Sequence, residues 1–252
     1  MLAITPSKAN AFLRGLAATL PRPDAVIVAS PHFPALIPIV VADPNPETIY
    51  DFRGFPPELS RITYPAPGDP ALAADVVGLI GEAGFDVRTL ERRGFDHGTW
   101  VPFSLIWPEA DIPIVQLSIQ PRQDAAYHTR LGTALRPLRD RNILVVGTGA
   151  ITHNLGELMR NGLADLDAEP ESWAAGFADW IAERAERGDR EALTDYRANA
   201  PSAVRAHPED DHFLPFFVAL GAAGEGAPSQ RIHRSIEYGA LTMDAYLFGA
   251  AA

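Results

Sequence analysis

The chain contains no cysteine. Disulfide bonds, zinc–thiolate sites and thiol nucleophiles are therefore excluded together, and any bound metal must be held by histidine and carboxylate side chains. No run of residues is apolar for long enough to cross a bilayer, and no charged start precedes a small-residue cleavage site. These absences predict a cytoplasmic protein.

Positive charge is also scarce. The 21 Lys and Arg residues stand against 32 Asp and Glu, which gives a formal net charge of −11. Because nucleic-acid backbones and anionic membrane surfaces both attract clustered basic residues, we expect neither as a partner. The length of 252 residues, with 47% hydrophobic and 21% charged residues, fits one large domain. The oligomeric state stays open, with a homo-oligomer among the expectations.

Several common catalytic and nucleotide-binding motifs are missing. Gly147-Thr-Gly149 begins like a dinucleotide-binding turn, but its third glycine would fall on Thr152, and no acidic residue follows a second strand at the required distance. The chain also has no Walker lysine, no G-x-S-x-G elbow and no H-E-x-x-H pair. The sequence therefore lacks the signatures of dinucleotide-binding enzymes, P-loop proteins, serine hydrolases and zincins.

Strand and helix patterns alternate along the chain. Buried-strand patterns cover residues 25–30, 36–41 and 112–119 and the strand and turn at 143–154, and helical patterns cover 7–20, 71–83, 127–138 and 173–181. This alternation predicts one α/β domain. A proline in the 36–41 segment suggests an edge strand or a bulge, and residues 236–248 resemble a hairpin or an edge strand. The aromatic stripe of the 173–181 helix is interpreted as core.

A long segment, residues 43–70, is rich in proline and glycine. A linker is one interpretation. The segment carries four aromatic residues, however, which is more than linkers usually contain: Tyr50, Phe52, Phe55 and Tyr64. We therefore expect an ordered loop that lines a pocket.

Histidines in loops are the strongest chemical signal. His153 follows the Gly147-Thr-Gly149 turn, past the carboxyl end of a strand expected to be central, where open α/β sheets place their ligands. A nearby helix start would keep its ring neutral, able to accept a proton or to bind a metal, although a histidine that caps a loop is the alternative.

Four histidines, counting His153, lie beside glycine, proline or aromatic residues, whereas three others have polar neighbours and are expected at the surface. The first group is His32, His97, His153 and His212, and the second is His128, His207 and His233. A divalent ion held by histidines, iron(II) or zinc(II), is the natural proposal. Four unrelated histidines remain the alternative.

Six stretches in order resemble one known family. They are residues 46–59, 64–70, 93–102, 113–119, 147–155 and 207–215. Together they resemble the DOPA-dioxygenase-type extradiol ring-cleaving enzymes of the class III, protocatechuate 4,5-dioxygenase-like superfamily. The resemblance implies a single α/β domain over residues 1–252, with a central mixed sheet and helices on both faces. It also implies an enzyme that opens a catechol-type ring with O₂ at one divalent ion.

The resemblance also assigns roles to the histidines. His32 and His212 resemble metal ligands. His153 resembles the acid/base histidine, which is sometimes counted in the metal shell, and His97 resembles a pocket histidine that faces substrate or oxygen. Four aromatic residues would surround the substrate ring or belong to the ordinary core: Phe52, Phe55, Trp100 and Phe213. Arg53 and Arg93 are candidates for binding a substrate carboxylate.

One part of the family pattern is missing. The family begins with a strand that ends in Ser-His-Gly-Ser-Pro and supplies a first metal ligand, but residues 1–7 match the family's next segment, after that strand, and no His, Asp or Glu precedes Asp24. Either this strand lies before Met1, or the metal site is incomplete. An incomplete site would suit a metal-poor homologue that binds an aromatic ligand or acts as a non-catalytic subunit. A zinc hydrolase is a third hypothesis, but it lacks an evident glutamate base.

Overall fold

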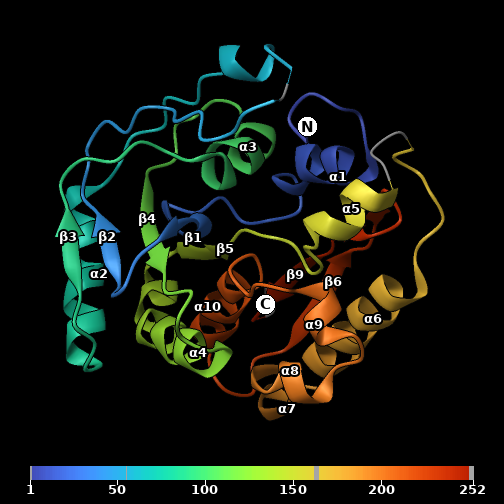
Figure 1. Cartoon of the computed structure of the whole chain (residues 1–252). Helices are drawn as coiled ribbons and strands as arrows, with labels where there is room; N and C mark the ends of the chain where they lie inside the picture. The colour runs from blue at the N-terminus through green and yellow to red at the C-terminus, as the bar shows by residue number, and fades with distance from the viewer. Residues whose placement is uncertain (1, 55, 162–164, 250–252) are drawn as a thin grey trace.

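A computed structural model describes residues 2–54, 56–161 and 165–249 of the chain (Figure 1). They form one α/β domain around a five-stranded sheet with the order β3-β2-β4-β1-β5. The strands are β1 (Ala25–Pro34), β2 (Ile39–Val41), β3 (Arg88–Leu90), β4 (Ile114–Ile119) and β5 (Ile143–Gly147). The predicted fold class is confirmed.

The sheet is mixed, as expected. β1 pairs in parallel with β4 and with β5, whereas β2 meets β4 in antiparallel fashion through Val40 and Leu117. Two expectations about strand position are wrong. β5 lies at an edge and β1 is interior, so His153 does not follow a central strand; β2 is also interior. Pro38 causes no conflict there, because β2 begins one residue after it, at Ile39.

Alternating side chains of β1 enter two separate cores, because successive residues of a strand point to opposite faces. Ile27 packs in a core with α2 (Pro70–Glu82), α4 (Ala125–Ala134) and α10 (Leu214–Ala223). Val26 and Val28 pack in another core, with α3 (His97–Ile106) and the partly buried side of α1 (Lys8–Leu16). Figure 1 shows α1 and α3 together on one side of the sheet. The prediction of helices on both faces is confirmed.

A third core lies beside the sheet, in the second half of the chain. It contains Trp173, Phe177 and Ile181 of α6 (Ser172–Glu186), so the aromatic stripe is core as predicted. The remaining elements in the second half are short: α5 (Leu155–Asn161), α7 (Arg190–Thr194), α8 (Tyr196–Asn199), α9 (Ala203–Ala206), β6 (Ser229–His233), β7 (Ile236–Glu237), β8 (Leu241–Thr242) and β9 (Ala245–Phe248). β7 and β8 form the expected hairpin, and β6 pairs with β9.

Two histidines expected at the surface are fully buried. The Nδ1–H group of His128 donates to the Asp124 carbonyl at 2.8 Å, and its Nε2 atom accepts from the Gln120 amide at 3.1 Å. His207 Nε2 lies 2.7 Å from the Ile151 carbonyl. Burial lowers the pKa of both rings to about 4. The surface prediction failed because polar neighbours in sequence do not show which way a helix or turn faces.

Within the described residues, no helix combines the length and the apolar character needed to span a bilayer.

Candidate active site formed by four histidines

The four histidines singled out in the sequence lie together, although each comes from a different segment. His32 is near the end of β1, His97 begins α3, His153 follows β5, and His212 precedes α10. The His32 ring centroid is 3.8 Å from that of His97 and 5.0 Å from that of His212. The His153 ring stacks on His212, with centroids 3.5 Å apart and planes 6° apart.

A buried serine and a glycine bring β1 and α3 together. The Ser30 hydroxyl donates to Asp96 Oδ1 at 2.6 Å, and the same oxygen atom of Asp96 accepts from Thr99 N at the start of α3. A Cβ atom on Gly98 would come within 2.4 Å of Ser30 Oγ and 3.1 Å of His32 Cδ2. Only glycine therefore allows the first turn of α3 to approach His32 this closely. His97 thus begins a helix capped by Asp96, not the glycine-flanked loop that the sequence indicated.

A second glycine turn carries His153 to His212. Gly149 lies against the backbone of the other segment, where a Cβ atom would come within 2.2 Å of the His212 carbonyl oxygen. The Ala150 amide donates to that carbonyl at 3.1 Å, and the His153 amide donates to the Ala206 carbonyl at 2.9 Å. These backbone hydrogen bonds bring the two rings into contact.

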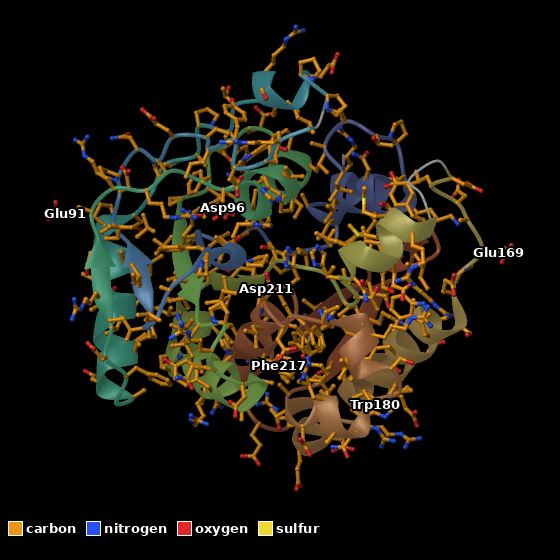
Figure 2. The ribbon with its side chains drawn as sticks, in the orientation of Figure 1. Glu91, Asp96, Glu169, Trp180, Asp211 and Phe217 are labelled. Atoms are coloured by element: carbon orange, nitrogen blue, oxygen red, sulfur yellow. The ribbon has the colours of Figure 1, made fainter. Side chains whose placement is uncertain are left out.

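The acidic residues before α10 do not cap it. No side chain caps α10, and Asp210 accepts from the Tyr196 hydroxyl at 2.7 Å and pairs with Arg197. Asp211 Oδ2 lies 3.0 Å from His212 Nδ1. That Nδ1 atom is buried, and its contact lowers the pKa of the Asp211 carboxyl against the opposing effect of burial. Figure 2 shows Asp96 and Asp211 between Glu91 and Glu169, which lie at opposite margins of the molecule.

Asp51 is a member of the site that the sequence did not single out. Its Oδ1 atom accepts from the His97 backbone amide at 3.0 Å and lies 2.8 Å from His97 Nδ1, and its Oδ2 atom lies 4.0 Å from His32 Nδ1. The atoms of His32, Asp51 and His97 that could bind a metal ion all lie within 4.8 Å of one another. Burial opposes ionisation of Asp51, but the hydrogen bonds and charge of His97 outweigh it and lower the pKa of the carboxyl.

Asp51 reaches the site through the 43–70 segment, whose described residues, 43–54 and 56–70, form an ordered loop as expected, although none of them lines the large cavity beside the histidines. Thr48 bridges to Phe95, and Trp100 Nε1 donates to the Ile49 carbonyl at 3.0 Å. The next residue, Phe52, makes an edge contact with the His97 ring at 5.7 Å. The one available signal for Asp51 was its place in the family-like stretch 46–59, and nothing in that stretch pointed to His97.

Two of the rings are neutral at pH 7. Burial and the nearby His97 and His212 lower the pKa of His32 to about 4. Burial and the adjacent His212 lower the pKa of His153 to about 3. Both rings therefore keep a free electron pair that can accept a proton or bind a metal ion.

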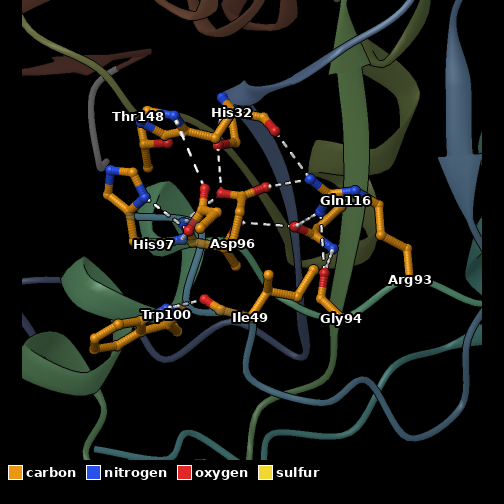
Figure 3. A network of polar contacts seen from close by, with 12 residues as sticks. His32, Ile49, Arg93, Gly94, Asp96, His97, Trp100, Gln116 and Thr148 are labelled. Atoms are coloured by element: carbon orange, nitrogen blue, oxygen red, sulfur yellow. Dashed lines mark hydrogen bonds and ion pairs between the residues drawn. The ribbon is translucent and has the colours of Figure 1, made fainter. Parts of the chain in front are cut away.

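Arg93 was a candidate for binding a substrate carboxylate, but its guanidinium is engaged by groups of the protein itself. Its guanidinium pairs with the buried Asp96 at 2.9 Å and donates to the His32 carbonyl at 3.0 Å (Figure 3). It also lies 4.0 Å from the Phe33 ring centroid. This occupied guanidinium supports the backbone of the site. Arg53 is exposed on the 43–70 loop.

An elongated cavity of about 790 Å³ runs from the four histidines along β5 to β9. Its volume lies within the range of small-molecule sites. Pro31 and Val101 line it. Phe213 also borders it, but its ring is buried and stacks on His207 with centroids 4.9 Å apart, and Trp100 is buried in the core formed with α3. Of the proposed ring-binding aromatics, Trp100 and Phe213 are therefore core residues, Phe52 contacts His97, and Phe55 lies outside the described residues.

Comparison with known proteins relates this arrangement to a family. The model of the catalytic LigB subunit of aromatic ring-opening dioxygenase matches residues 9–249. The chain is 42% identical over 229 residues to a 4,5-DOPA dioxygenase extradiol of Beta vulgaris, covering 90% of this chain and 83% of that protein. It is 37% identical over 231 residues to the 4,5-DOPA dioxygenase extradiol of Escherichia coli K12, with the same coverage. The crystal structure of the uncharacterized protein JW3007 from Escherichia coli K12 aligns with a TM-score of 0.77 and 32% identity, covering 96% of this chain and 92% of that one.

Proposed function

The chain belongs to the LigB family of aromatic ring-opening dioxygenases and is an extradiol enzyme, and from this premise we propose that it cleaves a catechol-type ring with O₂ at a divalent metal bound by its histidine cluster. The observation that carries the proposal is the contact of four imidazole rings from four segments. We further propose that residues 1–252 act as one catalytic domain.

The donor atoms present suit a divalent ion. His32 and His212 would bind it, with His153 beside them, because their rings converge and imidazole nitrogen is a common ligand for both iron(II) and zinc(II). Asp211, whose Oδ2 atom lies 3.0 Å from His212 Nδ1, would orient this ring and leave its Nε2 atom for the ion. The ion, when bound, supplies Lewis acidity toward the two catechol oxygens and a redox route from ring to O₂ if it is iron.

His153 is proposed to exchange protons with the substrate. Its neutral ring can accept the proton of a catechol hydroxyl and return it later, which is general acid–base catalysis. Stacking on His212 holds the ring in one plane, and the hydrogen bond from its backbone amide to Ala206 fixes the segment that carries it. His97 is proposed to contact the substrate from the side opposite His153 in this row of rings.

The experiment measures metal and activity together. Purified protein is loaded with iron(II) or with zinc(II), its metal content is determined by mass spectrometry, and oxygen uptake is followed with a panel of catechols. We expect one ion per chain, oxygen uptake with iron, and loss of uptake in His153→Ala with the metal retained. Protein that binds neither ion and consumes no oxygen would contradict the proposal and would fit the metal-poor, ligand-binding alternative.

A further inference from the structure

We propose that Asp51 is a positioning residue that fixes His97 in the tautomer with a proton on Nδ1, so that Nε2 faces the substrate as a hydrogen-bond acceptor. This inference rests on the proposed function, because it assigns a task to one histidine of that site.

The contacts of Asp51 determine the tautomer. One carboxylate oxygen lies 3.0 Å from the backbone nitrogen of His97 and 2.8 Å from its Nδ1 atom. An aspartate carboxyl is ionised at neutral pH, and an ionised carboxylate can only accept hydrogen bonds. His97 Nδ1 must therefore donate, and in the neutral ring Nε2 holds the free electron pair.

The same contacts fix the direction of the ring. The backbone amide and the ring Nδ1 atom of His97 both contact Asp51 Oδ1, so the side chain is held against the start of α3. His32 covers one side of the ring, at 3.8 Å between centroids, and the edge contact with Phe52 limits its rotation. His97 also lines the cavity that contains the other histidines.

This arrangement has a chemical consequence. A neutral ring with a free Nε2 atom can accept a hydrogen bond from a hydroxyl group, whereas it cannot donate one to an oxygen molecule. The partner that fits is therefore the hydroxyl of an aromatic diol. A carboxylate that fixes the tautomer of a histidine in this way is a recurring device in enzyme sites.

The group formed by His32, Asp51 and His97 also allows the opposite interpretation, in which Asp51 is itself a metal ligand. We favour the positioning role because Oδ1 is already engaged twice by His97, while Oδ2 is 4.0 Å from His32 Nδ1. The two roles predict different metal contents when the carboxylate is removed.

The test compares Asp51→Ala, which removes the acceptor of both His97 contacts, with His97→Gln, the double variant and a matched control, Glu58→Ala. Glu58 belongs to the same loop, is exposed, and caps no helix with its side chain. We expect kcat/KM of Asp51→Ala to fall by about 10- to 100-fold, as is usual when the carboxylate partner of a functional histidine is lost. The double variant should be no slower than His97→Gln, because Asp51 acts through His97. Metal content should stay that of the wild type in every variant.

A second readout does not depend on activity. In protein labelled with ¹⁵N-histidine, the His97 resonances are identified by their absence in His97→Gln. Long-range proton–nitrogen correlation should show Nδ1 protonated in the wild type and in Glu58→Ala, with Nε2 protonation appearing in Asp51→Ala, where Nδ1–H has lost its acceptor. This result would stand even if no catechol were cleaved.

Three outcomes would overturn the inference: an Nε2-protonated His97 in the wild type, loss of metal in Asp51→Ala, or a further fall in kcat/KM when Asp51→Ala is added to His97→Gln.

Discussion

Replacement of Arg93 by methionine should destabilise the protein strongly, because it leaves the buried carboxylate of Asp96 without its cation. Asp96 is 0% exposed, and the guanidinium lies 2.9 Å from Oδ2. Oδ2 makes no hydrogen bond within the described residues, so the ion pair is its main compensation. Removing one partner of a buried ion pair typically costs about 3–5 kcal/mol, which is a large share of the stability of a domain.

Smaller contributions come from the other contacts of the guanidinium. It donates to the Gln116 side chain at 2.9 Å and to the His32 carbonyl at 3.0 Å, and each such hydrogen bond contributes about 1 kcal/mol. Arg93→Lys keeps the charge but loses the planar fork, so its cost should be about 1–2 kcal/mol. The neighbouring Arg92 is exposed, and Arg92→Met should change stability by no more than about 0.5 kcal/mol.

Urea unfolding followed by circular dichroism measures these differences. In a double-mutant cycle, Asp96→Asn removes the buried charge that Arg93→Met leaves unpaired. The loss of stability in the double variant should therefore be about 1–3 kcal/mol smaller than the sum of the two single losses. If Arg93→Met does not fold, Arg93→Lys and the cycle built on it give the same comparison. Additive single changes, or a cost of Arg93→Met below about 1 kcal/mol, would refute the reasoning.

Three further predictions concern the site and its surroundings. Gly149→Ala should lower the free energy of unfolding in urea by about 1–3 kcal/mol and reduce oxygen uptake, because its Cβ atom would lie 2.2 Å from the His212 carbonyl oxygen. The control is Gly15→Ala on α1, whose Cβ atom would have no neighbour within 4 Å and which should be neutral or stabilising. Equal effects of the two substitutions would contradict this explanation. Stability should fall as the pH drops from about 6.5 toward 4, because the pKa values of His128 and His207 are lowered to about 4 and the unfolded chain binds more protons in that window. Each ring can contribute up to about 3 kcal/mol. Equal urea midpoints at pH 7 and pH 4.5 would count against this prediction. A chelator should abolish oxygen uptake and iron(II) should restore it in the wild type, with weaker restoration in His212→Ala, whereas full restoration in that variant would remove His212 from the proposed ligands.

The sequence alone was sufficient for the fold class and for the identity of the histidines that meet. Local patterns carried this information: the apolar run of β1 predicts a buried strand, the spacing of Trp173 and Phe177 predicts a helix, and six ordered stretches resemble one family.

Other features depended on contacts between distant segments. Asp51 and His97 are 46 residues apart, and contacts between their segments, such as the bridge between Thr48 and Phe95, make them neighbours. His128 and His207 have polar neighbours in sequence, yet both are buried, because the packing of α4 and of the turn after α9 determines which way they face. The sequence allows Arg93 to face a substrate, whereas in the fold its guanidinium pairs with Asp96 at 2.9 Å. Residue type determines which chemistry a side chain can perform, but its partner is set by long-range packing, which no local pattern records.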